Sequence, residues 1–291
     1  MFYSKKMTVV AAACFIMSVS GTVLAAPAAS PESVKGSQRT EIQATQQELA
    51  KEEMMSLLWM RSAAEYRALC YQGYNTAMAQ VDTALADPSR KGKPLAIVLD
   101  CDETVVDNIG GMSESASAGN GLYTSAWWRD WIHEARSGAM PGAANFLNEV
   151  HRKGVSIFYV SNRFAHINYA ATVKNLKELN FPSVDKEHLL LMTNTTDKQP
   201  RFDSVAAKYD VIVYMGDNAG DLPLHTDGTS MVQRNRIIDE HQADFGIKYI
   251  VFPNPAYGSW VGAMAKGYFS LTPQEREQVN RSILLKKTTI N

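Results

Sequence analysis

Leu95-Ala-Ile-Val-Leu-Asp-Cys-Asp-Glu-Thr104 is the stretch of sequence that decides the fold. Its five apolar residues are followed at once by two aspartates, Asp100 and Asp102. A second apolar run, residues 211–215, leads in the same way into Gly-Asp-Asn-Ala-Gly-Asp at residues 216–221. Short apolar runs of this kind are typical of buried strands in a parallel sheet. Carboxylates that gather at the ends of two such strands repel one another, so they predict a cation or a substrate that offsets their charge.

Apolar runs alternate with helical patterns through the middle of the chain. Five strands are predicted, at residues 95–99, 155–160, 189–192, 211–215 and 249–252. Three helices are predicted between them, at residues 141–150, 165–179 and 202–208. Pro141 at the start of the first helix and Gly154 just beyond its end fit the usual asymmetry of helix termini. This alternation predicts an α/β fold with a Rossmann-like parallel sheet and helices on both faces.

Three segments lie outside this alternation. Residues 41–90 show apolar side chains at helical spacing, residues 108–138 hold three tryptophans, and residues 255–291 contain the helix-start pattern Thr272-Pro-Gln-Glu275. We expect these segments to form a smaller helical cap. The α/β core then consists of residues 91–107 and 139–254.

The N-terminus has the pattern of an exported protein. Lys5 and Lys6 precede an apolar run that ends in small residues, which predicts a signal peptide at residues 1–26, followed by a flexible leader at residues 27–40. The expected location is periplasmic or secreted. Cys14 leaves an outer-membrane lipoprotein as the alternative, and the protein would then contact the membrane through its lipid anchor.

The charge balance excludes one class of partner. The chain has 29 basic and 30 acidic residues, and loss of Lys5 and Lys6 leaves 27 − 30 = −3. Without a basic tract, a nucleic-acid polymer is not the expected partner. Cys70 and Cys101 remain after cleavage; their pairing stays open, and we interpret both as small buried apolar residues.

Polar side chains follow four of the predicted strands. These are Asp100 with Asp102, then Ser161, then Lys198, then Asp217 with Asp221. Parallel sheets bind ligands at the carboxyl ends of their strands, so these groups are expected in one crevice. Each also has an ordinary interpretation, because Ser161-Asn162-Arg163 fits a helix cap and Lys198 fits a solvated loop.

The order of these motifs resembles that of the haloacid dehalogenase (HAD) superfamily. Asp-x-Asp-Glu-Thr, Ser-Asn-Arg, a lysine and Gly-Asp-x-x-x-Asp are similar to the motifs of bacterial class C acid phosphatases. These four-aspartate phosphohydrolases include lipoprotein 5′-nucleotidases. The resemblance extends over residues 41–268 and implies a HAD-like core.

The resemblance also implies a role for each acidic residue. Asp100 would be the nucleophile that forms an aspartyl-phosphate, and Asp102 the general acid and then the general base. Mg²⁺ would be bound by the side chains of Asp100 and Asp217 and by the Asp102 carbonyl. Asp221 would complete the acidic cluster.

Further residues are assigned by the same resemblance. Ser161 and Lys198 would bind the phosphoryl oxygens, whereas Arg163 and Asn218 are interpreted as structural. Aromatic residues hold the base in the related nucleotidases, and Tyr257 with Trp127 or Trp128 would do so in this chain, leaving Trp131 in the core. Stacking accepts every base, so tolerance among nucleotides is expected.

The predicted activity is therefore that of a secreted, Mg²⁺-dependent acid phosphatase or 5′-nucleotidase acting on small phosphomonoesters. The alternatives are a broad-specificity phosphatase or phosphotransferase with little base preference, and, in another class, a non-catalytic surface ligand-binding protein. The sequence leaves a homodimer open.

Overall fold

The computed structural model describes residues 46–90, 92–119 and 124–286. The predicted signal peptide, the leader and the candidate lipid anchor Cys14 lie outside these residues. Within the described part of the chain, no helix combines the length and the apolar character that a membrane crossing requires.

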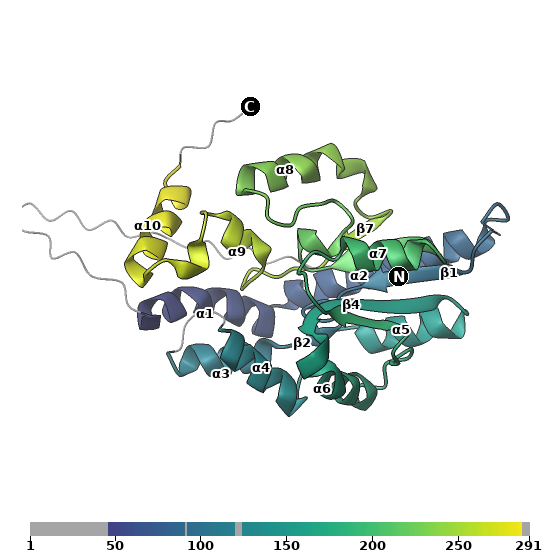
Figure 1. Ribbon diagram of the computed structural model, residues 1–291, viewed down its shortest axis with the longest axis horizontal. Coiled ribbons are helices and arrows are strands. Elements are labelled where there is room, and N and C mark those ends of the chain that lie inside the picture. Colours follow the sequence, from purple (N-terminus) through teal and green to yellow (C-terminus); the bar gives the residue numbers. More distant parts are fainter. Residues whose placement is uncertain (1–45, 91, 120–123, 287–291) are drawn as a thin grey trace, which may run out of the picture. The chain divides into compact units, whose positions relative to one another are not determined.

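A five-stranded parallel sheet lies at the centre of the described residues (Figure 1). Its strands are β1 (Leu95–Leu99), β4 (Ser156–Phe164), β5 (Leu189–Met192), β6 (Asp210–Gly216) and β7 (Tyr249–Val251). Their order is β5-β4-β1-β6-β7, so β1 occupies the middle and is paired on both sides. The prediction of a parallel α/β sheet is confirmed, and each strand lies where an apolar run predicted it.

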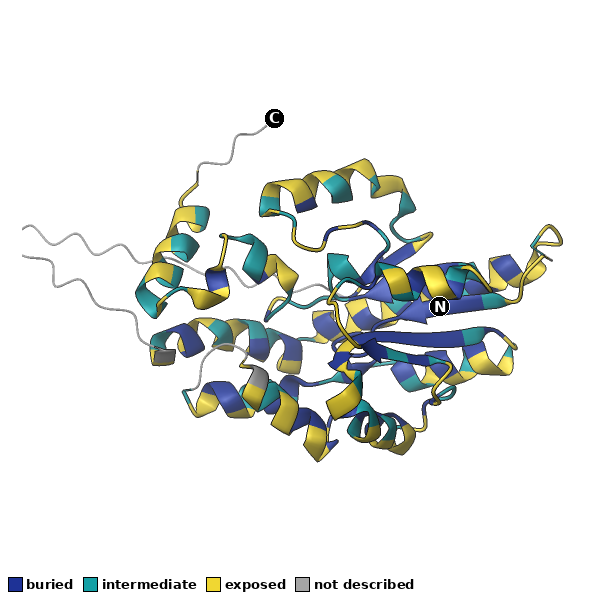
Figure 2. Cartoon of the chain, viewed as in Figure 1, coloured by how far each residue is buried: buried dark blue, intermediate teal, exposed yellow. Residues whose placement is uncertain are grey.

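The residues of β1 alternate between two apolar clusters because successive side chains of a strand point to opposite faces. Ile97 and Leu99 belong to the larger cluster, while Ala96 and Val98 belong to the smaller one. All four are at most 1% exposed, as the dark blue of the central strands shows in Figure 2. A strand buried on both faces explains why its sequence is continuously apolar.

Helices cover both faces of the sheet. The larger cluster takes in α2 (Ala64–Ala86), α5 (Ala143–Arg152) and α6 (Ala165–Glu178). The smaller cluster takes in α7 (Gln199–Ala206) and α8 (Met231–Glu240). Because β1 pairs parallel with β4 and β6, the carboxyl ends of these three strands lie at one edge of the sheet.

The remaining elements lie outside the five-stranded sheet and the helices just named. They are α1 (Gln46–Ser62), α3 (Ile109–Ser117), α4 (Ser125–Glu134), α9 (Ser259–Ala263), α10 (Pro273–Leu284), β2 (Val106–Asp107), β3 (Gly138–Ala139) and three 3₁₀ turns, Ala219–Asp221, Gln242–Asp244 and Tyr268–Ser270. The helix start predicted at Thr272 is confirmed by a capping box with Glu275. The division into core and cap stays a prediction. Helix α2, which falls in the segment assigned to the cap, packs on the sheet of the core.

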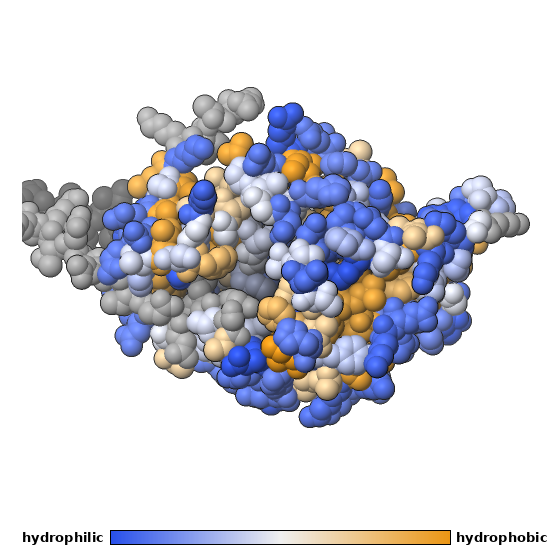
Figure 3. All heavy atoms as spheres, in the orientation of Figure 1, coloured by the Kyte–Doolittle hydropathy of each residue, from blue (hydrophilic) through white to orange (hydrophobic). Residues whose placement is uncertain are grey.

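Apolar residues are exposed near the end of α10. Leu284 and Leu285 are 82% and 79% exposed, and apolar atoms appear at this helix in the space-filling view (Figure 3). A groove of about 730 Å³ lies between α1, α9 and α10.

In the insertion between β2 and β3, the side chain of Trp131 lies in close contact with the backbone of Gly111. These strands pair antiparallel, so the chain leaves for α3 and returns from α4 at one place. The Trp131 indole lies on the backbone of Gly111, where an added Cβ would be 2.4 Å from the ring. Trp131 is 5% exposed, in agreement with its predicted place in the core.

This contact predicts different outcomes for two adjacent glycines. Gly111→Ala should lower the free energy of unfolding by about 1–3 kcal/mol, because its methyl group overlaps the Trp131 ring. Gly110→Ala is the matched control, since its Cβ would lie 3.9 Å from that ring, and it should change stability by no more than about 1 kcal/mol. Denaturant unfolding measures both, and equal losses would contradict the assigned contact.

Candidate active site

The end of β1 is a tight loop that presents Asp100 and Asp102. The Cys101 carbonyl accepts hydrogen bonds from the amides of Val105 and Val106, at 2.9 and 2.8 Å. Within the loop, Glu103 has a φ of 50°, in the left-handed region that residues with a Cβ rarely adopt. The strand ends at this turn, and Asp100 and Asp102 both lie in the loop that follows it.

The end of β6 brings the second pair of aspartates to the same place. The Asp100 amide donates to the carbonyl of Met215 at 2.9 Å, which joins the ends of β1 and β6. Asp221 folds back over Gly216, where an added Cβ would lie 2.1 Å from the Asp221 Cβ. Only glycine allows this approach. The Asn218 amide then holds Asp221 by donating to its Oδ2 at 2.9 Å.

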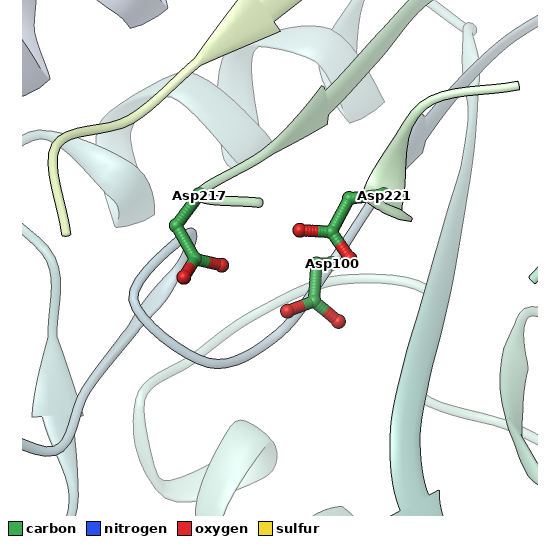
Figure 4. A group of neighbouring side chains, drawn as sticks. All are labelled: Asp100, Asp217 and Asp221. Carbon is green, nitrogen blue, oxygen red and sulfur yellow. The ribbon is translucent and has the colours of Figure 1, made fainter. Parts of the chain in front are cut away.

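Three carboxylates meet at this edge of the sheet. One oxygen each from Asp100, Asp217 and Asp221 lies within 4.8 Å of the others, and Figure 4 shows the three carboxyl groups gathered together. Lys198, at the start of α7, is 3% exposed and donates to Asp100 at 2.5 Å and to Asp221 at 2.7 Å. Asp217 accepts hydrogen bonds from Asn254 at 2.8 Å and Thr104 at 3.5 Å, both of which are neutral donors.

Burial and repulsion set the proton affinities of this cluster. Burial raises the pKa of Asp100 to about 7, against the opposing effect of Lys198 and with help from Asp221 and Asp102. Burial, followed by the charges of Asp221 and Asp100, holds the pKa of Asp217 well above its ordinary value. Burial alone would lower the pKa of Lys198, but its two carboxylate partners raise it above the ordinary value.

The donor set of this cluster fits a divalent cation. It offers only carboxylate oxygens, the ligands that hard cations such as Mg²⁺ and Ca²⁺ prefer. Lys198 contacts Asp100 and Asp221 but forms no ion pair with Asp217 among the described residues. Burial, and then the neighbouring carboxylates, raise the pKa of Asp217, so its negative charge is disfavoured there. A cation beside Asp100 and Asp217 would remove that repulsion.

Asp102 has a separate set of partners. Arg163, 2% exposed, donates to its carboxylate through Nη2 at 2.6 Å and Nε at 3.1 Å. Asn108 donates to the same carboxylate at 2.9 Å, and its own oxygen accepts from Trp131 and Ser137. Arg163 was interpreted as structural from the sequence, yet it is the residue that orients the predicted general acid.

Glu103 joins the catalytic loop to the predicted base-binding tyrosine. It is fully buried and accepts from the Tyr257 hydroxyl and from Asn108. Burial raises the pKa of Glu103 to about 8, with a further contribution from Asp102. Asn254, which donates to Asp217, also accepts from the backbone amide of Tyr257. The position of the Tyr257 ring is therefore fixed by the same loop that positions the aspartates.

A cleft of about 410 Å³ opens above these groups. Its lining includes the four aspartates and Lys198, Arg163, Asn218, Trp128 and Tyr257. The Trp128 and Tyr257 rings both line the cleft, with their centroids 6.2 Å apart and their planes tilted by 54°; we call this pair the aromatic slot. Trp127 lies next to Trp128, at 5.8 Å, and lines a smaller cavity behind this slot instead of the cleft.

Ser161 is placed differently from the other predicted residues. It lies within β4, which continues to Phe164, so the helix-cap interpretation of residues 161–163 is wrong. Its side chain is fully buried and accepts from the Arg163 amide, and it does not appear among the residues that line the cleft. Its role in phosphate binding stays a prediction.

Comparison with known proteins agrees with this geometry. Residues 16–260 match the family model described as HAD superfamily, subfamily IIIB (acid phosphatase). The structure of the class C acid phosphatase from Bacillus anthracis superposes with a TM-score of 0.77 at 37% identity, covering 84% of this chain and 99% of that one. The structure of the Bacillus anthracis enzyme with tungstate bound gives 0.76 and 36%, with the same coverage.

The carboxylate cluster predicts how stability depends on pH when no metal is bound. Asp100 has a folded-state pKa of about 7 against an ordinary value of 3.8, so between these values folding takes up a proton. Stability is therefore highest at the acidic end of this window and is lost as pH rises through it. In chelator, we expect the melting temperature to fall by roughly 5 °C across the window.

Two variants test the origin of that dependence. Asp217→Asn removes a second carboxyl group whose pKa is raised in the folded protein, so the pH profile should become flatter. The exposed Asp239→Asn should leave the profile unchanged. Parallel profiles for wild-type protein and Asp217→Asn, measured by thermal unfolding, would contradict this account.

Proposed function

The chain belongs to the subfamily IIIB acid phosphatases of the HAD superfamily, and from this we propose an exported, Mg²⁺-dependent 5′-nucleotidase. Membership confirms the family resemblance of the sequence and makes the protein a phosphomonoesterase acting on small phosphomonoesters. The proposal adds the metal, the nucleoside 5′-monophosphate substrates and the location.

One observation carries the proposal. The carboxylate cluster with Lys198 and the aromatic slot of Trp128 and Tyr257 line the same cleft. The groups that would bind a phosphoryl group and the rings that would contact a base therefore lie side by side. Tungstate is an oxyanion like phosphate, and its presence in the Bacillus anthracis relative supports an oxyanion site here.

Asp100 acts as the nucleophile in the proposed reaction. Its carboxylate oxygen forms a bond to phosphorus while the bond from phosphorus to the ester oxygen breaks, giving an aspartyl-phosphate. Lys198, 2.5 Å from Asp100, balances charge that builds on the phosphoryl oxygens. Asp100, Asp217 and the Asp102 carbonyl would hold Mg²⁺, with Asp221 nearby, and the bound ion would supply further positive charge to the phosphoryl group.

Asp102 moves the proton. It protonates the departing alkoxide, and the carboxylate that results is stabilised by Arg163 and Asn108. In the second half it takes a proton from the water that attacks the aspartyl-phosphate, which restores Asp100 and releases phosphate. Arg163 keeps the carboxyl group in one position through both halves.

The expected location is the periplasm or the medium, on the basis of the signal-peptide pattern at residues 1–26. A lipoprotein anchored at Cys14 is the alternative. Radiolabelled fatty acid incorporated into the wild-type protein but not into Cys14→Ser would favour the anchor.

The mechanism predicts the effect of removing the nucleophile. Asp100→Asn should lower kcat for every phosphomonoester by at least about a thousandfold, and chelator should abolish the wild-type activity until Mg²⁺ is restored. Phosphate release measured on the purified protein tests both statements, with Asp239→Asn as the control. Turnover that persists in chelator would refute the metal dependence, and absence of turnover across a broad phosphoester panel would favour the ligand-binding alternative.

The aromatic slot predicts a preference for nucleotides over base-free substrates. Trp128→Ala should lower kcat/KM for nucleoside 5′-monophosphates by about tenfold or more, because stacking is worth about 1–3 kcal/mol per base. Ribose 5-phosphate should be little affected. Trp127→Ala, which changes a ring outside the cleft, should have the smaller effect. Equal rates on nucleotides and ribose 5-phosphate that do not respond to Trp128→Ala would instead indicate broad specificity.

A further inference from the structure

A small cavity lies directly behind the aromatic slot. It measures about 30 Å³ and shares Trp128 and Tyr257 with the catalytic cleft. A nucleotide whose base contacts these two side chains would have its phosphate at the aspartates of the cleft. The edge of the base farthest from the phosphate would then face this cavity. The remaining lining is mostly apolar and comes from α1, α3, α4 and the chain before Tyr257, with Ser115 as a polar member.

Glu53 of α1 is the charged exception in that lining, and it also lines the groove between α1, α9 and α10. Among the residues that the structure describes, none donates a hydrogen bond to its carboxyl group. A half-buried carboxyl group without a partner costs stability, and the apolar neighbours Leu57, Met112 and Ala256 do nothing to reduce that cost. Such a group is expected where a ligand supplies the missing hydrogen bonds.

We propose that Glu53 binds the edge of the nucleobase and is a specificity-determining residue of this enzyme. The inference rests on the proposed nucleotidase function and deepens it. Glu53 would contact the part of the substrate farthest from phosphorus, so it would favour nucleotides over other phosphomonoesters without taking part in the bond-breaking step.

The protonation state of Glu53 decides what it recognises. Burial raises its pKa to about 7, so at acidic pH it is a neutral acid with one donor and one acceptor. Each base carries an adjacent donor and acceptor on its pairing edge: N6–H and N1 in adenine, N4–H and N3 in cytosine, N1–H and O6 in guanine, N3–H and O4 in uracil. A neutral carboxyl group can therefore form a pair of hydrogen bonds with each of the four bases.

Above its pKa, Glu53 becomes an acceptor only. Guanine, with two neighbouring donors at N1 and N2, then fits best, while adenine has lost the donor that faced N1. The titratable groups on the surrounding elements are Glu52, Tyr257, Tyr268, Glu277 and Arg281, and Arg281 is paired with Glu277. Base preference should therefore shift toward guanine as pH rises through about 7.

Steady-state kinetics on the Mg²⁺-loaded full-length protein test the proposal. The substrates are AMP, GMP, CMP, UMP and ribose 5-phosphate, and the variants are Glu53→Ala, Glu53→Gln and the control Glu52→Gln, which lines only the neighbouring groove. Glu53→Ala should lower kcat/KM for all four nucleotides by about tenfold at acidic pH, the value of one net hydrogen-bonded contact. Ribose 5-phosphate hydrolysis should stay within about twofold.

Glu53→Gln separates recognition from packing. Its amide keeps one donor and one acceptor but does not titrate, so nucleotide hydrolysis at acidic pH should be retained and the pH-dependent rise in the GMP to AMP ratio should disappear. Glu52→Gln should keep that rise.

Two outcomes would overturn the inference in different ways. If Glu53→Ala slows ribose 5-phosphate as much as the nucleotides, or leaves all of them unchanged while the wild type still prefers nucleotides, Glu53 does not bind the base. If the wild type itself shows no preference for nucleotides over ribose 5-phosphate, the proposed substrate class fails and this inference fails with it.

Discussion

Repulsion among the carboxylates at the ends of β1 and β6 is the constraint on which the rest of the structure depends. Three of them meet within 4.8 Å, and one buried lysine offsets only part of their charge. Three features of the backbone hold the carboxylates in place. They are the hydrogen-bonded ends of β1 and β6, the turn at Glu103, and Gly216, which has no side chain. The packing of a sheet buried on both faces offsets the cost of this repulsion, and a bound cation would remove it.

The sheet could be predicted from the sequence because its evidence is local. Continuous apolar runs at β1 and β6 have one common explanation, and the aspartates that follow them fall at the strand ends for topological reasons. The capping box at Thr272 was equally readable. The strand β4 was underestimated at its end, since Ser161-Asn162-Arg163 has the composition of a cap and continues as strand only because β5 pairs with it.

The partners of the aspartates could not be predicted in the same way. Arg163 reaches Asp102 across 61 residues of sequence, and Asn254 reaches Asp217 across 37, so no spacing rule relates them. Gly111 likewise is understood only once Trp131 is seen lying on its backbone. Glu53 lies in a helix that the sequence identifies only by the spacing of its apolar residues. Its proposed role in binding the base depends on the side chains that line the same cavity. Long-range side-chain pairs of this kind depend on packing, which a single sequence does not encode in any short window.

The hydrogen bonds of Glu103 have a consequence for how such an enzyme can diversify. Through Asn108 and Tyr257, one buried side chain supports both the proton-transferring carboxyl group and a wall of the substrate slot. Changes that remodel this wall from the tyrosine side would disturb turnover as well, so most would be removed by selection. The opposite wall, Trp128, belongs to α4, and α4 is joined to the same loop because Trp131 donates to Asn108. The cavity behind the slot is lined in part by α1, through Glu53 and Leu57. Divergence of substrate range within this architecture should therefore accumulate in α1, while the loop after β1 and the side of α4 that contacts it change little.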